Sequence, residues 1–302
     1  MKVEELFLSL GYTKDEYEGI INNYSICNLK TETLFNNVAR NYKFLIGLGY
    51  SREEVIKMTK SLPPIYGYSI ENMKQKIEDI ESLGYSREEV IKMTKSLPPI
   101  YGLSIENMKQ KIEDIESLGY SREEVIKMTK SLPPIYGYSI ENLKQKIEDI
   151  ESLGYSREEV IKMTKSLPSI YSYSIENMKQ KIEDIESLGY SREEVIKMTK
   201  SLPSIYGYSI ENMKQKIEFY DDIDMHDLAV IDPKKLMQSV KLSYARYNFY
   251  KDRGIEINMN NYRKLFIGNK QFEKQYGITK EEILKKYNYE ENLEEKKNGP
   301  VI

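Results

Sequence analysis

Residues 48–218 consist of five consecutive copies of one 35-residue unit, LGYSREEVIKMTKSLPPIYGYSIENMKQKIEDIES. The copies begin at Leu48, Leu83, Leu118, Leu153 and Leu188, and the fifth breaks off after Glu218. The substitutions among them are Leu103 for Tyr, Leu143 for Met, Ser169 and Ser204 for the second proline, and Ser172 for Gly. Tandem units of roughly 20–50 residues bury their apolar faces against one another, so the repeat predicts a solenoid.

The first half of the unit predicts a helix that proline ends. Ser51 and Glu54 have the spacing of a capping box, in which each side chain accepts a hydrogen bond from the other residue's backbone N–H. Pro63 and Pro64 stop the helix because proline clashes with an α-helical residue before it. The stretch from Pro63 to Tyr68 is too short for an α-helix but has room for one 3₁₀ turn.

The second half predicts another helix, capped by Ser69, with one apolar face. Its stripe consists of Ile70, Met73, Ile77, Ile80 and Leu83. Gly84 is suited to the left-handed conformation that ends a helix. The unit therefore reads as helix, proline turn, helix and glycine turn.

The flanks read as divergent copies of the unit. Residues 10–47 match its start without the central proline, and we expect residues 1–47 to form an N-terminal cap repeat. Residues 219–288 are expected to form a degenerate repeat and basic cap. Within them, Asp232 as N-cap and Pro233 as first residue predict a helix to about Asp252. A capping box of Thr279 and Glu282 predicts a last short helix.

The predicted fold is thus all-α, a superhelical solenoid of about seven two-helix repeats with divergent end caps. It is expected to form a single domain over residues 1–288. The charged stretch over residues 289–302 is poor in apolar side chains, and we predict a disordered tail there.

Composition excludes several classes of protein. No apolar run approaches the ~20 residues of a membrane span, and the start, MKVEELFLSLGY, resembles neither a signal nor a transit peptide. We therefore expect a cytoplasmic monomer that does not contact membranes. The single Cys27, and the single His226 between Asp224 and Asp227, argue against disulfides, metal sites and Cys–His catalysis. With no phosphate-cradling glycine motif or nucleophile elbow either, we predict no metal, no cofactor and no enzymatic activity.

The charge is unevenly distributed along the chain. Residues 233–280 carry eleven Lys and Arg against three Asp and Glu, a net charge of +8 within a chain of net charge −3. The rest of the chain is therefore net −11. Such asymmetry suggests that one end contacts a polyanion.

Stacking of the repeats predicts two ladders of lysines at the end of the first helices. They are Lys57, Lys92, Lys127, Lys162 and Lys197, and Lys60, Lys95, Lys130, Lys165 and Lys200. Acids such as Glu53, Glu54 and Asp79 are assigned to the opposite end, so we predict one basic and one acidic edge. The basic edge is a candidate phosphate track, and an ordinary solvated surface is the equally weighted alternative.

The repeat also places one tyrosine in each proline turn, beside the lysine ladders. These residues are Tyr66, Tyr101, Tyr136, Tyr171 and Tyr206. Packing between repeats is the favoured interpretation, and base stacking is the alternative.

In the helix predicted from Pro233, Lys235, Arg246 and Arg253 fall on one strip at about 100° per residue. Lys234 and Lys241 fall on an adjacent strip. This cationic face is the strongest local indication of nucleic-acid binding, and an end cap that is merely soluble is the alternative.

The unit resembles the repeat of the mitochondrial transcription termination factor (mTERF) family. The resemblance lies in the order of its parts: a helix, the motif S-L-P-x-I-x-G-x-S, a second helix and the pair L-G. The residues that carry it in the first copy are Pro63, Ile65, Ser69, Glu71, Asn72, Lys74, Ile77, Leu83 and Gly84. The resemblance covers about residues 10–288, with Gln75 where the family often has proline and an acidic charge where members are usually basic. It implies a curved superhelix that binds nucleic acid, mostly duplex DNA. A tetratricopeptide-like array, whose period is about one residue shorter, fits less well.

Two functional hypotheses follow. The first is a nucleic-acid-binding solenoid, with duplex DNA favoured over RNA, that acts by backbone and shape contacts in transcription regulation or termination. The second is a protein-interaction scaffold, which the acidic total charge favours. The salt dependence of binding distinguishes the two.

Overall fold

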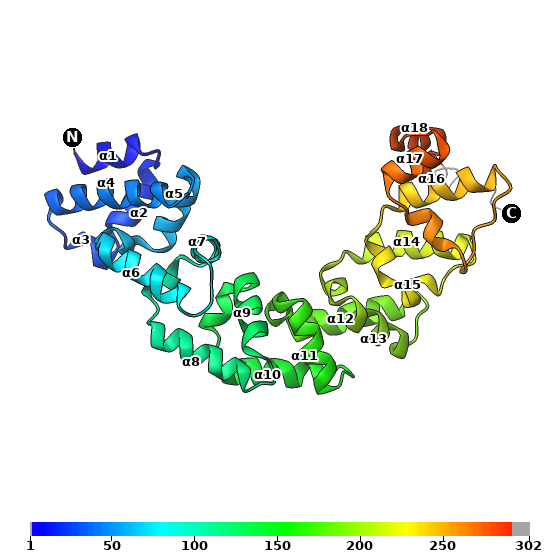
Figure 1. The fold of residues 1–302 in the computed structure, drawn as a ribbon, viewed down its shortest axis with the longest axis horizontal. Coiled ribbons are helices and arrows are strands. Elements are labelled where there is room, and N and C mark those ends of the chain that lie inside the picture. Colours follow the sequence, from blue (N-terminus) through cyan, green and yellow to red (C-terminus); the bar gives the residue numbers. More distant parts are fainter. Residues whose placement is uncertain (1, 292–302) are drawn as a thin grey trace. The chain divides into compact units, whose positions relative to one another are not determined.

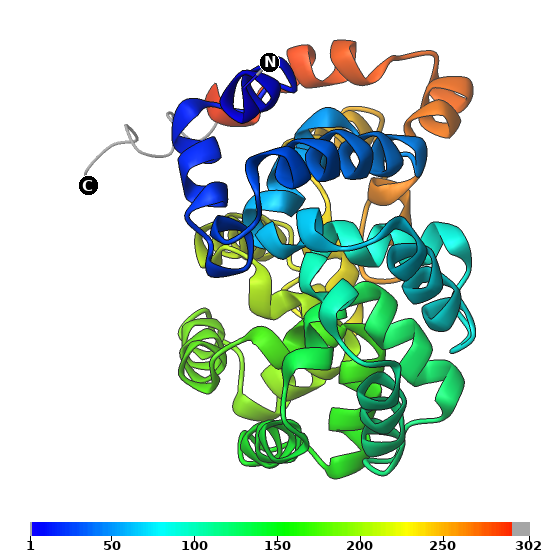
Figure 2. The same ribbon diagram turned by 90° about the vertical axis from the view of Figure 1, so that its left-hand side faces the viewer.

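The computed structural model describes residues 2–291 of the chain. These residues form helices and connecting turns alone (Figure 1, Figure 2), as the sequence predicts. The chain divides into two compact units, residues 1–145 and 146–302, and the boundary falls inside one helix of the third copy. Within each unit, every repeat packs on the next repeat along the chain, which is the behaviour of a solenoid.

Each of the five copies forms a helix, a 3₁₀ turn and a second helix. The first helices are α5 (Arg52–Ser61), α7 (Arg87–Ser96), α9 (Arg122–Ser131), α11 (Arg157–Ser166) and α13 (Arg192–Ser201). The turns are η1 (Pro63–Gly67), η2 (Pro98–Gly102), η3 (Pro133–Gly137), η4 (Pro168–Ser172) and η5 (Pro203–Gly207). The second helices are α6 (Ile70–Glu81), α8 (Ile105–Glu116), α10 (Ile140–Glu151), α12 (Ile175–Glu186) and α14 (Ile210–Asp222).

The local signals in the sequence set these boundaries. Ser51 accepts a hydrogen bond from the backbone N–H of Glu54, and the Glu54 side chain accepts one from the Ser51 N–H, which completes the capping box. Leu62 leaves the helical conformation, with φ −134° and ψ 68°, because Pro63 follows it. Gly84 has φ +110°, a region that disfavours a side chain. The turns η4 and η5 have serine in place of the second proline and still form, so the second proline is not needed for the turn.

The core of each repeat is the predicted apolar stripe together with the turn. Val55, Ile65, Ile77 and Ile80 are fully buried in the first copy, and Met73 is nearly so. Burying an aliphatic side chain of this size contributes about 1.5–3 kcal/mol. Because a single helix pair cannot cover these residues, each repeat depends on its neighbours for stability.

The N-terminal residues form four helices that resemble the repeat. Its elements are α1 (Val3–Ser9), α2 (Lys14–Ile21), α3 (Tyr24–Cys27) and α4 (Thr31–Gly47). Thr13 and Glu16 form the same capping box as Ser51 and Glu54. In place of a proline turn, the short helix α3 packs on η1.

The C-terminal residues correct one prediction. Their elements are α15 (Leu228–Ile231), η6 (Pro233–Met237), α16 (Val240–Lys251), η7 (Tyr262–Phe266), α17 (Asn269–Tyr276) and α18 (Lys280–Lys286). No α-helix starts at Pro233, because Asp232 has the same non-helical geometry as Leu62, with φ −138° and ψ 73°. Pro233 therefore opens a sixth 3₁₀ turn, and Ser239 caps the helix that follows. This sixth repeat, the opening repeat and the five copies make up the seven repeats that the sequence predicts.

The capping box of Thr279 and Glu282 opens α18 as predicted. Of the tail predicted over residues 289–302, residues 292–302 lie outside the described part of the chain. Tyr289 itself is buried, and the centroid of its ring lies 5.3 Å from that of Tyr244. The packed structure therefore extends past the predicted start of the tail.

Candidate nucleic-acid interface

The first lysine ladder lies exposed on the first helices. Three of its members pair with the glutamate one turn earlier in the same helix: Lys92 with Glu88 at 2.9 Å, Lys127 with Glu123 at 2.8 Å, and Lys162 with Glu158 at 3.1 Å. These lysine side chains are 70–71% exposed. Exposed pairs of this kind stabilise a helix only slightly, so a phosphate can replace the carboxylate at little cost.

The second lysine ladder has a structural role instead. Lys60, Lys95, Lys130 and Lys200 pair with Glu16, Glu54, Glu89 and Glu159 of the preceding repeat, with Nζ–Oε distances of 2.8–2.9 Å. Lys165, the remaining member, is half-buried. The partners are the capping-box glutamates, so acids and bases that the sequence assigned to opposite edges meet in the structure. The prediction of one basic and one acidic edge is therefore wrong.

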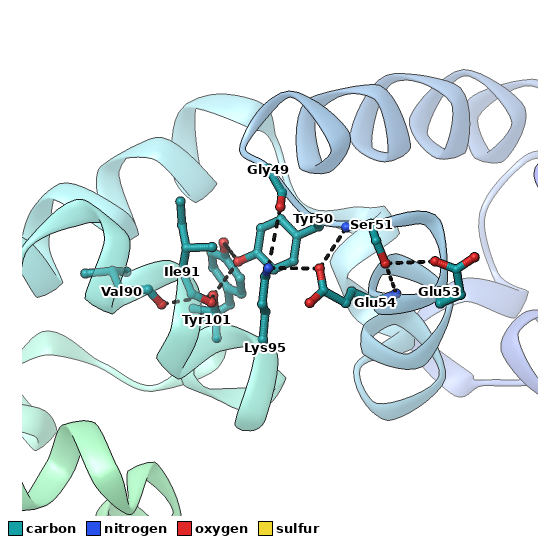
Figure 3. Close-up of polar contacts among 10 residues, drawn as sticks. Gly49, Tyr50, Ser51, Glu53, Glu54, Val90, Ile91, Lys95 and Tyr101 are labelled. Carbon is teal, nitrogen blue, oxygen red and sulfur yellow. Dashed lines mark hydrogen bonds and ion pairs between the residues drawn. The ribbon is translucent and has the colours of Figure 1, made fainter. Parts of the chain in front are cut away.

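Figure 3 shows this contact at Lys95. Its Nζ lies 2.9 Å from Glu54 Oε2 and 3.4 Å from the carbonyl oxygen of Gly49, and 5.4 Å from the centroid of the Tyr50 ring. The Lys95 ammonium group, together with the N–H of Ser51, lowers the pKa of Glu54. A nucleic acid would have to break these contacts to recruit Lys95.

The turn tyrosines belong to the core. Tyr66, Tyr101, Tyr136, Tyr171 and Tyr206 are at most 9% exposed, so their faces are closed to bases and the packing interpretation holds. Tyr12 of the opening repeat reaches into the next repeat, where its hydroxyl lies 2.6 Å from that of Tyr66 and 2.8 Å from Thr59 Oγ1. Burial raises the pKa of Tyr66, and the same direction holds for Tyr101, Tyr136 and Tyr206.

The same three-hydroxyl contact recurs along the stack. It joins Tyr50 to Thr94 and Tyr101, Tyr85 to Thr129 and Tyr136, and Tyr155 to Thr199 and Tyr206. At the sixth repeat, Ala229 occupies the position of the threonine, and Tyr190 donates to the carbonyl oxygen of His226 instead. Each contact fixes one repeat against the next.

A further row of side chains, missed in the sequence, bridges successive repeats. Lys76 donates from Nζ to the carbonyl oxygen of Leu103, which follows the next proline turn, at 2.5 Å. We call the equivalent residues the bracket residues: Asn41, Lys76, Lys111, Lys146, Lys181, Lys216 and Arg246, each of which donates to a carbonyl oxygen in or directly after the following turn. The sequence signal for these residues is their position: in the first copy Lys76 lies at the margin of the apolar stripe, between Met73 and Ile80.

The predicted cationic strip in the C-terminal region is divided in the structure. Lys235 lies in η6, where it pairs with Asp232 at 3.5 Å and lies over the ring of Phe266. Arg246 is a bracket residue and only 3% exposed. Arg253 is exposed and stacks on the ring of Phe249, 3.5 Å from its centroid. The three do not form one phosphate-binding face, because the helix that would align them starts only at Val240.

Of the adjacent strip, Lys234 and Lys241 are exposed, and Lys241 pairs with Glu290. Five side chains of η6, η7 and α17, which we call the end cations, are exposed and have no ion-pair partner among residues 2–291. They are Lys234, Arg263, Lys264, Lys270 and Lys274. The turns η6 and η7 that carry the first three are in contact, since the Tyr262 hydroxyl donates to Asp232 Oδ2 at 3.2 Å.

Equivalent positions change sign along the stack. The second residue of the second helix is acidic in the five copies, as Glu71, Glu106, Glu141, Glu176 and Glu211, but is Lys241 in α16 and Lys270 in α17. The second residue of the turn is proline or serine in the copies but Lys234 and Arg263 in η6 and η7. A lysine near a helix N-terminus is unfavourable for the helix but favourable for an anion, so this reversal makes the C-terminal end the candidate for a phosphate contact.

The single histidine contacts one carboxylate and one aromatic ring. His226 Nδ1 lies 2.5 Å from Asp221 Oδ1, and its ring stacks on Tyr190 with 4.2 Å between centroids. No group of three His, Cys, Asp or Glu side chains within residues 2–291 is placed to hold a metal ion. Over the same residues, no helix is long and apolar enough to span a membrane.

Comparison with known proteins agrees with the repeat structure. A model of the mTERF family matches residues 2–81, 36–116 and 110–273, which together span most of the chain. No curated protein sequence matches it. Members of the family are non-enzymatic. The repeating unit of two helices around a proline turn, together with this match, shows that the chain belongs to the mTERF family of nucleic-acid-binding helical-repeat proteins.

Proposed function

We propose that the protein binds duplex DNA through its sugar-phosphate backbone, with the C-terminal end as the contact, and that it acts in transcription regulation or termination. The observation that carries the proposal is the sign reversal at equivalent positions of η6 and α16 and of η7 and α17. The exposed end cations supply charge where the five copies supply acids or uncharged residues. Side chains of this type position a protein on a duplex without reading its sequence.

The near-identity of the five copies supports backbone and shape contacts over a base-by-base code. Repeat proteins that read one base per repeat need side chains that vary between repeats. Here the exposed residues of α6 and α8 are the same. The first lysine ladder could add contacts along a duplex, because its exposed ion pairs are weak.

The test is a fluorescence-anisotropy titration against random duplex DNA, single-stranded DNA and duplex RNA at 50 and 200 mM salt. Changing Lys234, Arg263 and Lys270 to Glu should lower the affinity for duplex DNA and reduce the slope of log K against log salt by about 2.7, or about 0.9 per lost phosphate contact. The matched control changes Lys74, Lys109 and Lys179 to Glu, which alters the net charge equally at exposed positions of the copies. Equal loss in both variants would contradict a C-terminal interface.

A protein-interaction scaffold is the second candidate function. It is favoured by the row of acids that begins the second helices of the five copies, which repels phosphate and suits a basic partner. Absence of binding to any of the three nucleic acids at 50 mM salt would support this function over the first.

A further inference from the structure

A hollow of about 190 Å³ lies in the C-terminal unit, between the start of α16 and the turn that leads into α17. Ser239, Leu242, Arg246, Leu265, Gly268 and Asn269 are among the residues that line it. The volume is sufficient for one phosphate group. Its walls combine a buried cation with a helix N-terminus, and each feature favours an anion for a different physical reason.

The buried cation is Arg246. Its Nη1 donates to the carbonyl oxygens of Leu265 at 2.9 Å and Ile267 at 2.6 Å, and its Nη2 donates to Asn269 Oδ1 at 2.9 Å. All these acceptors are uncharged, its Nε is buried without a hydrogen-bond partner, and no carboxylate in the described chain lies within ion-pair distance of it. A charge withdrawn from water without a counter-ion is costly, and an anion in the adjoining hollow would reduce that cost.

The helix N-terminus is that of α17, an eight-residue helix. In the five copies and in α16 a serine occupies the N-cap position of the second helix, as Ser69 and Ser239 do, but in α17 that position is Gly268, and no side chain caps the helix. The first N–H groups of α17 are therefore available to an anion at the mouth of the hollow. Lys270, the second residue of the helix, is exposed and adds a positive charge to its first turn.

We propose that this hollow is a phosphate-binding site, in which Arg246 and the N-terminus of α17 together hold one phosphate group of a nucleic acid. The site rests on the proposed function and makes it more specific, because it identifies one anchoring contact among the diffuse end cations. The phosphate can be an internal phosphodiester or a terminal phosphomonoester, and both present the oxygens that these donors require.

The decisive variant is Asn269→Asp. An aspartate at this position keeps an oxygen acceptor for Arg246 Nη2 and adds a favourable acid at the first residue of α17, so the fold should be at least as stable. Its carboxylate would also place a negative charge in the hollow and compete with phosphate. Asn260→Asp is the matched control, since it adds the same charge at an exposed position between α16 and η7.

Two measurements on the full chain are needed. The first is the rise in thermal midpoint when inorganic phosphate replaces chloride at constant ionic strength. The second is the affinity for duplexes with 5′-phosphate or 5′-hydroxyl ends. In Asn269→Asp we expect the phosphate-induced rise to be lost, the affinity for duplex to fall about tenfold and the salt slope to fall by about 0.9, whereas Asn260→Asp should behave as the wild type.

The outcomes separate the site from the function. An unchanged phosphate-induced rise in Asn269→Asp would overturn the site, even if the duplex still binds elsewhere. If Asn269→Asp loses the phosphate-induced rise but the wild type binds no duplex, the phosphate site is supported and the DNA-binding proposal is overturned. If the loss of affinity is confined to 5′-phosphorylated duplexes, the ligand is the terminal phosphomonoester; if both duplexes lose affinity equally, it is the internal phosphodiester.

Discussion

Lys95 of the second copy forms an ion pair with Glu54 of the first, with 2.9 Å between Nζ and Oε2 (Figure 3). Glu54 also closes the capping box that starts its own helix. One carboxylate therefore links the start of one first helix to the end of the next. The five-fold repetition of the sequence turns this pair into a regular feature of the stack, with direct consequences for the pH dependence of stability.

The stability should fall in acid. Lysine and backbone N–H partners lower the pKa of Glu16, Glu54, Glu89 and Glu159 below the reference value of 4.5. Since these pKa values are lower in the folded state, the stabilisation is present above pH about 4.5 and is lost as the pH falls through the folded-state values. Denaturation midpoints between pH 3 and 7 should show this decline.

The lysine partners provide the control for that measurement. Changing Lys60, Lys95, Lys130 and Lys200 to Gln should flatten the pH profile, because the largest cause of the lowered pKa values is removed. Changing Lys74, Lys109, Lys144 and Lys179 to Gln removes the same charge from exposed positions and should leave the profile nearly as steep. Identical profiles in the two variants would mean that the inter-repeat pairs do not matter.

Tyr85→Phe should destabilise the protein by about 1–2 kcal/mol, because it leaves the buried hydroxyls of Thr129 and Tyr136 without this partner. Chemical denaturation followed by circular dichroism would measure the change. Tyr24→Phe is the control, since Tyr24 is 84% exposed and should tolerate the change. A Tyr85→Phe protein as stable as Tyr24→Phe would show that the hydroxyl contact contributes nothing.

Lys181→Met should cost about 1–2 kcal/mol in the free energy of unfolding. The bracket residue Lys181 donates to the carbonyl oxygen of Tyr208 at 2.5 Å, and methionine keeps the apolar stem while removing the donor. Lys179→Met, two residues earlier on the exposed side of α12, should be close to neutral. Equal effects of the two substitutions in denaturant titrations would argue against the bracket.

Deletion of residues 83–117 should leave a folded, shorter protein that still unfolds cooperatively. The deletion would bring Tyr50 to Thr129 and Tyr136, and Glu54 to Lys130, which are the same pairs of residue types that exist now. Deletion of residues 84–117 leaves one extra residue at the junction, shifts this register and should reduce stability sharply. Loss of the cooperative transition in the first deletion would contradict nearest-neighbour stacking.

Most of the fold could be predicted from the sequence because its signals are local. Ser51, Glu54, Pro63, Ser69 and Gly84 act on backbone groups a few residues away, so their spacing set the elements correctly. Pro233 was the exception. A proline after an aspartate suits either a helix start or a 3₁₀ turn, and the structure has the turn, with the Tyr262 hydroxyl donating to Asp232.

The sequence by itself determined the all-α class, the 35-residue period, the capping boxes and the family resemblance, since each depends on residues close together along the chain. The tertiary structure decided which side chains are free to bind a ligand. Tyr12 meets Tyr66 across 54 residues and Lys60 meets Glu16 across 44. Such contacts depend on how one repeat stacks on the next. The burial of the turn tyrosines, the pairing of the second ladder and the burial of Arg246 without an ion pair therefore became visible only in three dimensions.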